Sequence, residues 1–195
     1  MRLKIVQAGE PVLRQRAREL SSEELGSPEI QRLIEWMRET MRDAPGVGLA
    51  APQVGLPLQL AVIEDPAEVQ RAMPPEKLAE RGRRPVPFHV IVNPRLTPDG
   101  SPVEFFEGCL SVTGFVGLVP RAVRARVECL NEMGQPVSIE ADGWYARILQ
   151  HEIDHLHGTL YLDRMHTRTF TTLEHMNRHW NELPIAEVKQ RLGIA

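Results

Sequence analysis

The sequence has no apolar run long enough to cross a membrane, which needs about 20 consecutive apolar residues. It has only two cysteines, too few for a disulfide framework, so a reducing compartment is expected. Basic residues are not in excess, because 23 basic and 26 acidic side chains give a net charge of −3. This balance argues against a nucleic-acid binder. The first seven residues are charged and lack the apolar core of a secretory signal, so we expect a cytoplasmic location and no membrane partner.

The apolar pattern predicts an α+β fold in a single domain over residues 1–195. Helices are expected over residues 28–42 and 184–192 and in a central helix that begins after Asp142 as cap and ends at Gly158. Strands are expected over residues 58–63, 89–94, 103–106, 116–120, 123–130 and 135–140, with turns at 97–100 and 131–134. We therefore predict antiparallel strands packed around a central helix.

A proline-rich segment over residues 64–87 is expected to leave the core. Residues 67–81 within it have helical character. The short basic run at residues 83–84 is expected to be a solvated surface.

The predicted central helix contains the pattern H-E-x-x-H at residues 151–155. Residues four apart lie on nearly the same side of a helix, so His151 and His155 can direct their imidazoles at one metal ion. Glu152 lies one step round the helix and can reach a water molecule bound to that metal. A catalytic zinc-type centre takes three protein ligands and keeps one position open for water, so a third ligand is required.

Two residues are candidates for the third ligand. Cys109 follows a glycine at the end of a predicted strand, and a thiolate is a strong ligand for a soft or borderline metal. Glu174 lies downstream at a distance that suits a helical glutamate ligand, although the longer zinc-binding continuation is absent. Cys129 lies inside a predicted strand and is expected to be core packing.

Small residues dominate residues 46–55. They allow another chain or a substrate backbone to approach closely. The same composition is typical of a tightly packed strand and turn with Gln53 merely exposed, and the residues alone leave both interpretations open.

Three segments in this order resemble the signature motifs of peptide deformylase: GVGLAAPQ at 46–53, EGCLS at 107–111 and QHEIDHL at 150–156. The resemblance extends from about residue 7 to residue 170. Residues 64–87, 143–144 and 164–170 are similar to the organellar-type branch of that family. The resemblance implies a peptide-deformylase-like catalytic domain that hydrolyses the formyl group from the N-terminal methionine of newly synthesised polypeptides and releases formate.

The resemblance implies a metal centre and a base. Cys109, His151 and His155 would bind one Fe²⁺ ion, for which Zn²⁺, Ni²⁺ or Co²⁺ can substitute, with water as the fourth ligand. Glu152 would take a proton from that water and later deliver one to the leaving amine.

The resemblance also implies a substrate track. The Gln53 amide and the backbone N–H of Leu110 would stabilise the oxyanion that forms on the formyl oxygen. An N-formylmethionyl peptide would lie as an added strand beside residues 46–51, with Gly48 as a backbone contact. The methionine pocket would be formed by Val47, Glu107, Gly108, Leu110, Trp144 and His151.

Further expectations concern the scaffold and the partners. Arg121 is expected to pair with Asp154 and hold the central helix against the sheet. Val116 stands where many bacterial members carry an arginine that reaches the substrate, a departure that bears on affinity rather than chemistry. The ribosome near its exit tunnel is an expected partner. Two alternatives are a metallopeptidase that uses Glu174 and a family member that binds formylated peptides without turnover.

Overall fold

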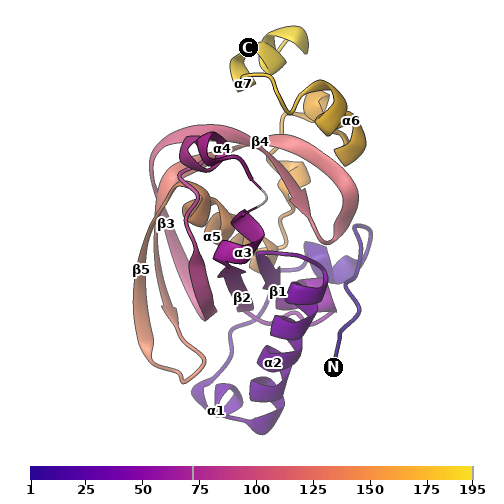
Figure 1. Ribbon diagram of the computed structural model, residues 1–195. Helices are drawn as coiled ribbons and strands as arrows, with labels where there is room; N and C mark the ends of the chain where they lie inside the picture. Colours follow the sequence, from indigo (N-terminus) through magenta and orange to yellow (C-terminus); the bar gives the residue numbers. More distant parts are fainter. Residues whose placement is uncertain (72, 195) are drawn as a thin grey trace.

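An antiparallel sheet forms the framework of the molecule (Figure 1). The computed structural model describes residues 1–71 and 73–194, and within them the strand order is β1-β2-β3-β4-β5, with β6 paired to β4. The strands are β1 (Gly48–Ala50), β2 (Leu60–Asp65), β3 (Val86–Cys109), β4 (Val112–Leu130), β5 (Pro136–Asp142) and β6 (Thr171–Thr172). Each of these pairings is antiparallel, which confirms the prediction.

Strands β3 and β4 are longer than the sequence predicts. In the β3 region two strands with a turn at 97–100 were expected, and in the β4 region two consecutive strands over 116–120 and 123–130. Each region instead forms a single strand, and residues 92–109 of β3 pair with β4 along the whole of β4. The expected turn at 97–100 is wrong, because the chain does not reverse there. Instead the register shifts between Asp99 and Pro102, and Gly100 adopts a φ of +80°. The turn-forming residues therefore produce an irregularity within a strand whose pairing continues on both sides.

Seven helices lie in the described part of the chain: α1 (Ser22–Leu25), α2 (Pro28–Asp43), α3 (Ala67–Gln70), α4 (Pro75–Glu80), α5 (Gly143–Leu156), α6 (Leu173–His179) and α7 (Ile185–Arg191). Helices α2, α5 and α7 match the predictions closely, whereas α1 and α6 were not predicted. The helical character expected over 67–81 belongs to α3 and α4, and Ala72 between them lies outside the described residues. None of these helices combines the length and apolarity that spanning a bilayer requires.

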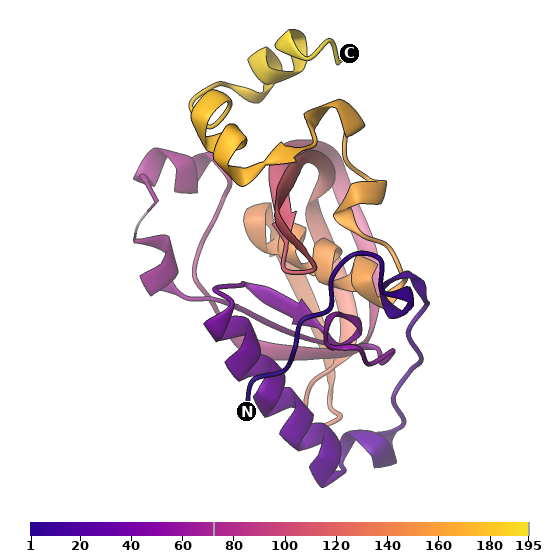
Figure 2. The ribbon, with the colours of Figure 1, turned by 90° about the vertical axis from the view of Figure 1, so that its right-hand side faces the viewer.

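The helices gather at two ends and in the centre. Helices α1 and α2 lie at one end, and α6 and α7 (yellow) lie at the other in both views (Figures 1 and 2). Ser27 caps α2, because its hydroxyl accepts a hydrogen bond from the Ile30 N–H at 3.3 Å. In the same described part of the chain, four 3-10 turns connect other elements: η1 (Pro11–Arg14), η2 (Ala51–Val54), η3 (Tyr161–Asp163) and η4 (Thr167–Thr169).

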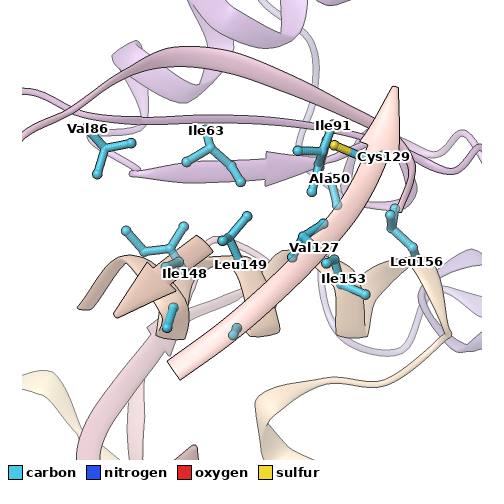
Figure 3. Packing of buried hydrophobic residues seen from close by; sticks show 14 of the residues in the cluster. Ala50, Ile63, Val86, Ile91, Val127, Cys129, Ile148, Leu149, Ile153 and Leu156 are labelled. Carbon is cyan, nitrogen blue, oxygen red and sulfur yellow. The ribbon is translucent and has the colours of Figure 1, made fainter. Parts of the chain in front are cut away.

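Helix α5 lies in the centre of the molecule (Figure 1) and packs against the sheet through apolar side chains (Figure 3). Its side of the core consists of Ile148, Leu149, Ile153 and Leu156, and the strands contribute Ala50, Ile63, Ile91 and Val127. Each isoleucine, leucine or valine side chain among them contributes about 1.5–3 kcal/mol by leaving water. Asp142 precedes the helix as expected, but its side chain makes no capping hydrogen bond. Packing rather than capping therefore fixes the helix that carries the H-E-x-x-H pattern.

Candidate metal centre and active site

Three candidate metal ligands meet between α5 and the end of β3. The thiol of Cys109 and one ring nitrogen each of His151 and His155 lie within 4.8 Å of one another. Helix α5 supplies both histidines from adjacent turns, and β3 supplies the cysteine as its last residue. Cys109 Sγ lies 3.3 Å from His155 Nε2. One thiolate and two imidazoles suit a borderline divalent metal such as iron or zinc.

The other residues considered as ligands lie elsewhere. Glu174 is exposed on α6 and is not part of the group formed by Cys109 and the two histidines. Cys129 is buried in β4, and burial raises the pKa of its thiol to about 11, as expected for core packing. The geometry therefore favours Cys109 over Glu174.

Glu107 orients one of the two histidines. Its Oε2 lies 3.1 Å from Nδ1 of His151, a contact that fixes the ring and leaves Nε2 for a metal. The sequence suggested Glu107 only as part of a substrate pocket, so this contact was missed. Nδ1 of His155 is buried and has no hydrogen-bond partner among the described residues.

A buried ion network holds α5 against β3 and β4. Arg121 donates to both carboxylate oxygens of Glu107 at 3.0 Å and also to Asp154, which confirms the predicted Arg121–Asp154 pair. Arg147 donates to Glu107 Oε1 at 2.6 Å. Burial by itself would raise the pKa of the Glu107 carboxyl, but the hydrogen bond with His151 and the charge of Arg121 hold it well below its usual range. The network therefore keeps Glu107 ionised beside the metal ligands.

Arg147 and Arg164 were not predicted to take part in this network. Arg164 donates to both oxygens of Asp154 at 2.6 Å, and Arg147 is buried on α5. The residues around a single arginine in an amphipathic helix, such as Arg147, do not show whether its side chain is buried in an ion pair or exposed to solvent.

Replacing Arg121 with methionine is expected to lower the free energy of unfolding by roughly 3–5 kcal/mol, because two buried carboxylates lose their shared partner. Urea unfolding at neutral pH measures this change. Arg124→Met, on the same strand, removes an exposed pair with Asp99 and is expected to leave the unfolding midpoint nearly unchanged. Equal, small effects of both substitutions would show that the network does not hold the helix.

Glu152 lies buried beside β1. Its Oε2 has no hydrogen-bond partner among the described residues, and burial raises the pKa of its carboxyl to about 7. A Cβ atom at Gly48 would lie only 2.2 Å from Glu152 Oε1. Glycine at this position therefore makes the room that the carboxylate occupies. A carboxyl group with such a pKa can both accept and donate a proton near neutral pH.

Gln53 is held in η2 at the same site. It is only 1% exposed, so the interpretation that it is merely exposed is wrong. Its Oε1 accepts a hydrogen bond from the Ala50 N–H at 2.9 Å, which turns the amide nitrogen towards the metal ligands. That nitrogen lies 3.3 Å from Ser111 Oγ and 3.5 Å from Cys109 Sγ.

A cavity of about 540 Å³ opens over these groups. Its walls include ten of the predicted site residues: Val47, Gly48, Gln53, Glu107, Gly108, Cys109, Leu110, Trp144, His151 and Glu152. His155 is buried behind the cavity wall, in contact with Cys109. The structure thus brings together all the residues that the three sequence segments singled out.

Further cavity walls come from segments that the sequence did not indicate. Leu173 and Met176 of α6 line it, as do Arg81 and Arg83 after α4. The expected solvated basic run is wrong for Arg83, whose side chain is 10% exposed and pairs with Asp65 at 2.8 Å. Arg84 is exposed, as predicted.

Comparisons with known proteins agree with this arrangement. The family model described as "Polypeptide deformylase" matches residues 2–170. Peptide deformylase 1A, chloroplastic, from Solanum lycopersicum is 47% identical over 191 residues, which cover 97% of this chain and 67% of that protein. Peptide deformylase 3 from Streptomyces avermitilis is 50% identical over 194 residues, which cover 99% of this chain and 84% of the relative.

A solved structure shares the fold. The class I type b peptide deformylase from Acinetobacter baumannii, bound to Met-Ala-Ser, has a TM-score of 0.75 and 32% identity over 85% of this chain and 99% of that chain. The extent of the family match and the identity to these two relatives confirm the resemblance seen in the three motifs. The chain belongs to the peptide deformylase family and is a hydrolase that removes the formyl group from the amino terminus of newly synthesised polypeptides.

Proposed function

We propose that Cys109, His151 and His155 hold one Fe²⁺ ion, and that Glu152 transfers the protons during hydrolysis of N-formylmethionyl peptides. The observation that carries this proposal is the convergence of the three ligand groups within 4.8 Å, beside a buried carboxyl group with a pKa raised to about 7. When bound, the metal supplies Lewis acidity that lowers the pKa of a water molecule towards neutrality. Zn²⁺, Ni²⁺ or Co²⁺ can replace iron, since the ligand set suits each of them.

The side chains around the ligands account for the bond changes. Glu152 takes a proton from the attacking water as its oxygen adds to the formyl carbon. The formyl oxygen then carries negative charge, to which Gln53 Nε2 and the Leu110 N–H donate hydrogen bonds. The carbon–nitrogen bond breaks, and Glu152 delivers its proton to the leaving amine. The products are formate and a free amino terminus.

The sheet offers an edge for the peptide. Strand β1 pairs only with β2 in the described sheet, so its other edge is available for an added strand. We place the substrate backbone along this edge at Gly48. The methionine side chain would then enter the part of the cavity lined by Val47, Glu107, Gly108, Leu110, Trp144 and His151. The Met-Ala-Ser peptide bound to the Acinetobacter baumannii relative supports an N-terminal methionine in such a site.

We further propose that residues 1–195 act as a single catalytic domain, in the cytoplasm and near the exit tunnel of the ribosome. Formylated amino termini first become accessible there. Sedimentation of the protein with translating ribosomes, compared with run-off ribosomes, tests this location. Absence of the protein from both the translating and the run-off ribosome fractions would contradict the proposed location near the exit tunnel.

The reaction is tested with formyl-Met-Ala-Ser and anaerobically purified, iron-loaded protein. Formate and Met-Ala-Ser should appear in equal amounts, with no cleavage at either internal bond. Release of a dipeptide or a free amino acid would support a metallopeptidase instead. Peptide binding without formate would support a family member that has lost turnover.

Gly48→Ala is expected to reduce the kcat/KM of formate release by roughly a hundredfold while metal content stays at one ion per chain. The new Cβ would overlap Glu152 Oε1, and a displacement of about 1 Å at a reacting group can cost that factor. Formate release and metal analysis on the same preparation measure both quantities. Gly26→Ala is the matched control, because its Cβ would meet only ordinary contacts at 3.5 Å or more. Full activity of Gly48→Ala would contradict the proposal that the space left by glycine at this position is needed for Glu152.

A further inference from the structure

Arg81 directly follows α4 as its C-cap residue and lies against the first turn of α5. The two segments touch through backbone, since a Cβ at Gly143 would lie 2.7 Å from the Gly82 carbonyl oxygen and 2.8 Å from that of Arg81. Gly143 also has a φ of +55°, a conformation that favours glycine. This close approach positions the Arg81 side chain beside Trp144, the second residue of the helix.

The Arg81 guanidinium stacks on aromatic rings. Its Cζ lies 4.8 Å from the centre of the Trp144 ring and 5.6 Å from that of Phe105. Such contacts attract a cation to the ring face but satisfy none of its N–H donors. Nε of Arg81 is buried without a hydrogen-bond partner in residues 1–71 and 73–194. The guanidinium therefore keeps donors available for another group.

Arg81 differs from the two other arginines that lie against Trp144. Arg83 pairs with Asp65 through two hydrogen bonds of 2.8 Å. Arg147 pairs with Glu107. Arg81 forms no ion pair within the described residues, and burial, together with the nearby charge of Arg83, lowers its pKa. A half-buried cation without an anionic partner is costly, and an incoming anion would offset that cost.

The unpaired cation lies in the wall of the same cavity as the metal ligands. Arg81, Trp144, His151 and Glu152 all line it. Trp144 and His151 are two turns apart on α5, a rise of about 10 Å. In an extended peptide the third residue lies about 7 Å beyond the first, and both side chains point to the same face. A peptide that runs from His151 towards Trp144 would therefore bring a carboxylate at its third residue to the part of the wall where Arg81 lies.

We propose that Arg81 is a specificity-determining residue that binds a carboxylate of the substrate, carried either by an acidic side chain at the third residue or by the C-terminus of a short formylated peptide. This inference rests on the proposed function, because it extends the same cavity beyond the methionine. Arg81 takes no part in bond cleavage, so its effect should fall on KM and not on kcat.

The test compares matched formylated peptides with the wild-type protein, Arg81→Met and Arg84→Met. Formyl-Met-Ala-Ser is compared with its C-terminal amide, and formyl-Met-Ala-Asp amide with formyl-Met-Ala-Asn amide. A third pair places Asp or Asn at the second residue. Wild-type protein should prefer the carboxylate in one or both of the first two pairs by about tenfold in kcat/KM, the scale of a charged hydrogen bond. The pair that shows the preference identifies the source of the carboxylate.

In Arg81→Met, the ratio of kcat/KM for the carboxylate peptide to kcat/KM for its neutral counterpart should fall to about one. The change should arise from KM. Arg84 is the matched control, since it lies three residues further on and is exposed, and Arg84→Met should retain the preference. An equal preference in wild type and Arg81→Met, no preference in wild type, or a preference confined to the second-residue pair would overturn the proposal. Thermal unfolding shows whether each variant is folded, and Arg81→Lys should recover part of the preference.

Failure of the proposed function is a separate outcome. If no peptide releases formate, equilibrium binding of Met-Ala-Ser and its amide to the wild-type and Arg81→Met proteins still tests the carboxylate contact. Tighter binding of the free carboxylate that depends on Arg81 supports the inference without turnover. Equal binding of these two peptides to the wild-type protein, together with equal binding of Met-Ala-Asp amide and Met-Ala-Asn amide, overturns it.

Discussion

Cys109→Ala is expected to remove the metal ion and to reduce formate release by about a thousandfold or more. The thiol lies 3.3 Å from His155 Nε2, and its loss leaves two imidazoles as ligands. A catalytic metal contributes several kcal/mol to stabilising the transition state, and each 1.36 kcal/mol is a factor of ten in rate. Metal analysis and a formate assay on the same anaerobic preparation measure the two losses together.

Cys129→Ala is the matched control for this substitution. Cys129 is buried in β4 and is not part of the ligand group, so this variant should keep one metal ion per chain and its activity. Retention of a full metal content by Cys109→Ala would show that another group is the third ligand. Glu174 would then be the first residue to test, although it is exposed on α6.

Glu152→Gln is expected to retain the metal ion and to lose a factor of about 10² to 10⁴ in kcat. Glutamine has nearly the same size as glutamate and fits the space beside Gly48, but it cannot accept the proton of the attacking water. The KM for formyl-Met-Ala-Ser should change little, since Glu152 is not proposed to hold the peptide. Steady-state kinetics and metal analysis separate the two effects.

Glu174→Gln provides the corresponding control on α6. It should leave both kcat and metal content unchanged, because Glu174 lies outside the ligand group. An active Glu152→Gln variant with its metal in place would mean that another group carries the proton. Loss of the metal from Glu152→Gln would mean instead that the carboxylate contributes to binding the ion.

The H-E-x-x-H helix could be predicted because its signal is local. Helical spacing alone aligns His151 with His155, and the apolar residues of the same segment identify the buried face. Helix α2 was equally predictable, from its serine cap and its repeating apolar residues. In both cases the information lies within a few turns of the chain.

The third ligand depends on contacts that no local pattern reports. Cys109 and His155 are 46 residues apart, and their contact depends on how β3 packs against α5. The residues alone left Cys109 and Glu174 as alternatives, and the family resemblance selected Cys109. The geometry agrees with that selection. The contact of Glu107 with His151 was missed for the same reason, because it joins two elements 44 residues apart.

Strand lengths and the outer walls of the cavity could not be read from composition. Proline and glycine within residues 97–100 predicted a turn, but pairing with β4 before and after this segment keeps the chain extended. The basic run after α4 has the composition of a solvated surface. Within this run the side chain of Arg83 is nevertheless mostly buried, because it pairs with Asp65 and lies over the ring of Trp144. Both features depend on the tertiary fold rather than on neighbours in the chain.

The central claim is that one metal ion, held by Cys109, His151 and His155, supports deformylation with Glu152 as the proton carrier. Its most direct test is a titration of metal-depleted protein with Fe²⁺ under anaerobic conditions, in which formate release from formyl-Met-Ala-Ser is followed. The rate should rise in proportion to bound iron and stop rising at one ion per chain. Glu152→Gln should bind the same amount of iron with little formate release. Formate release at full rate without metal, or a requirement for a second ion per chain, would contradict the claim.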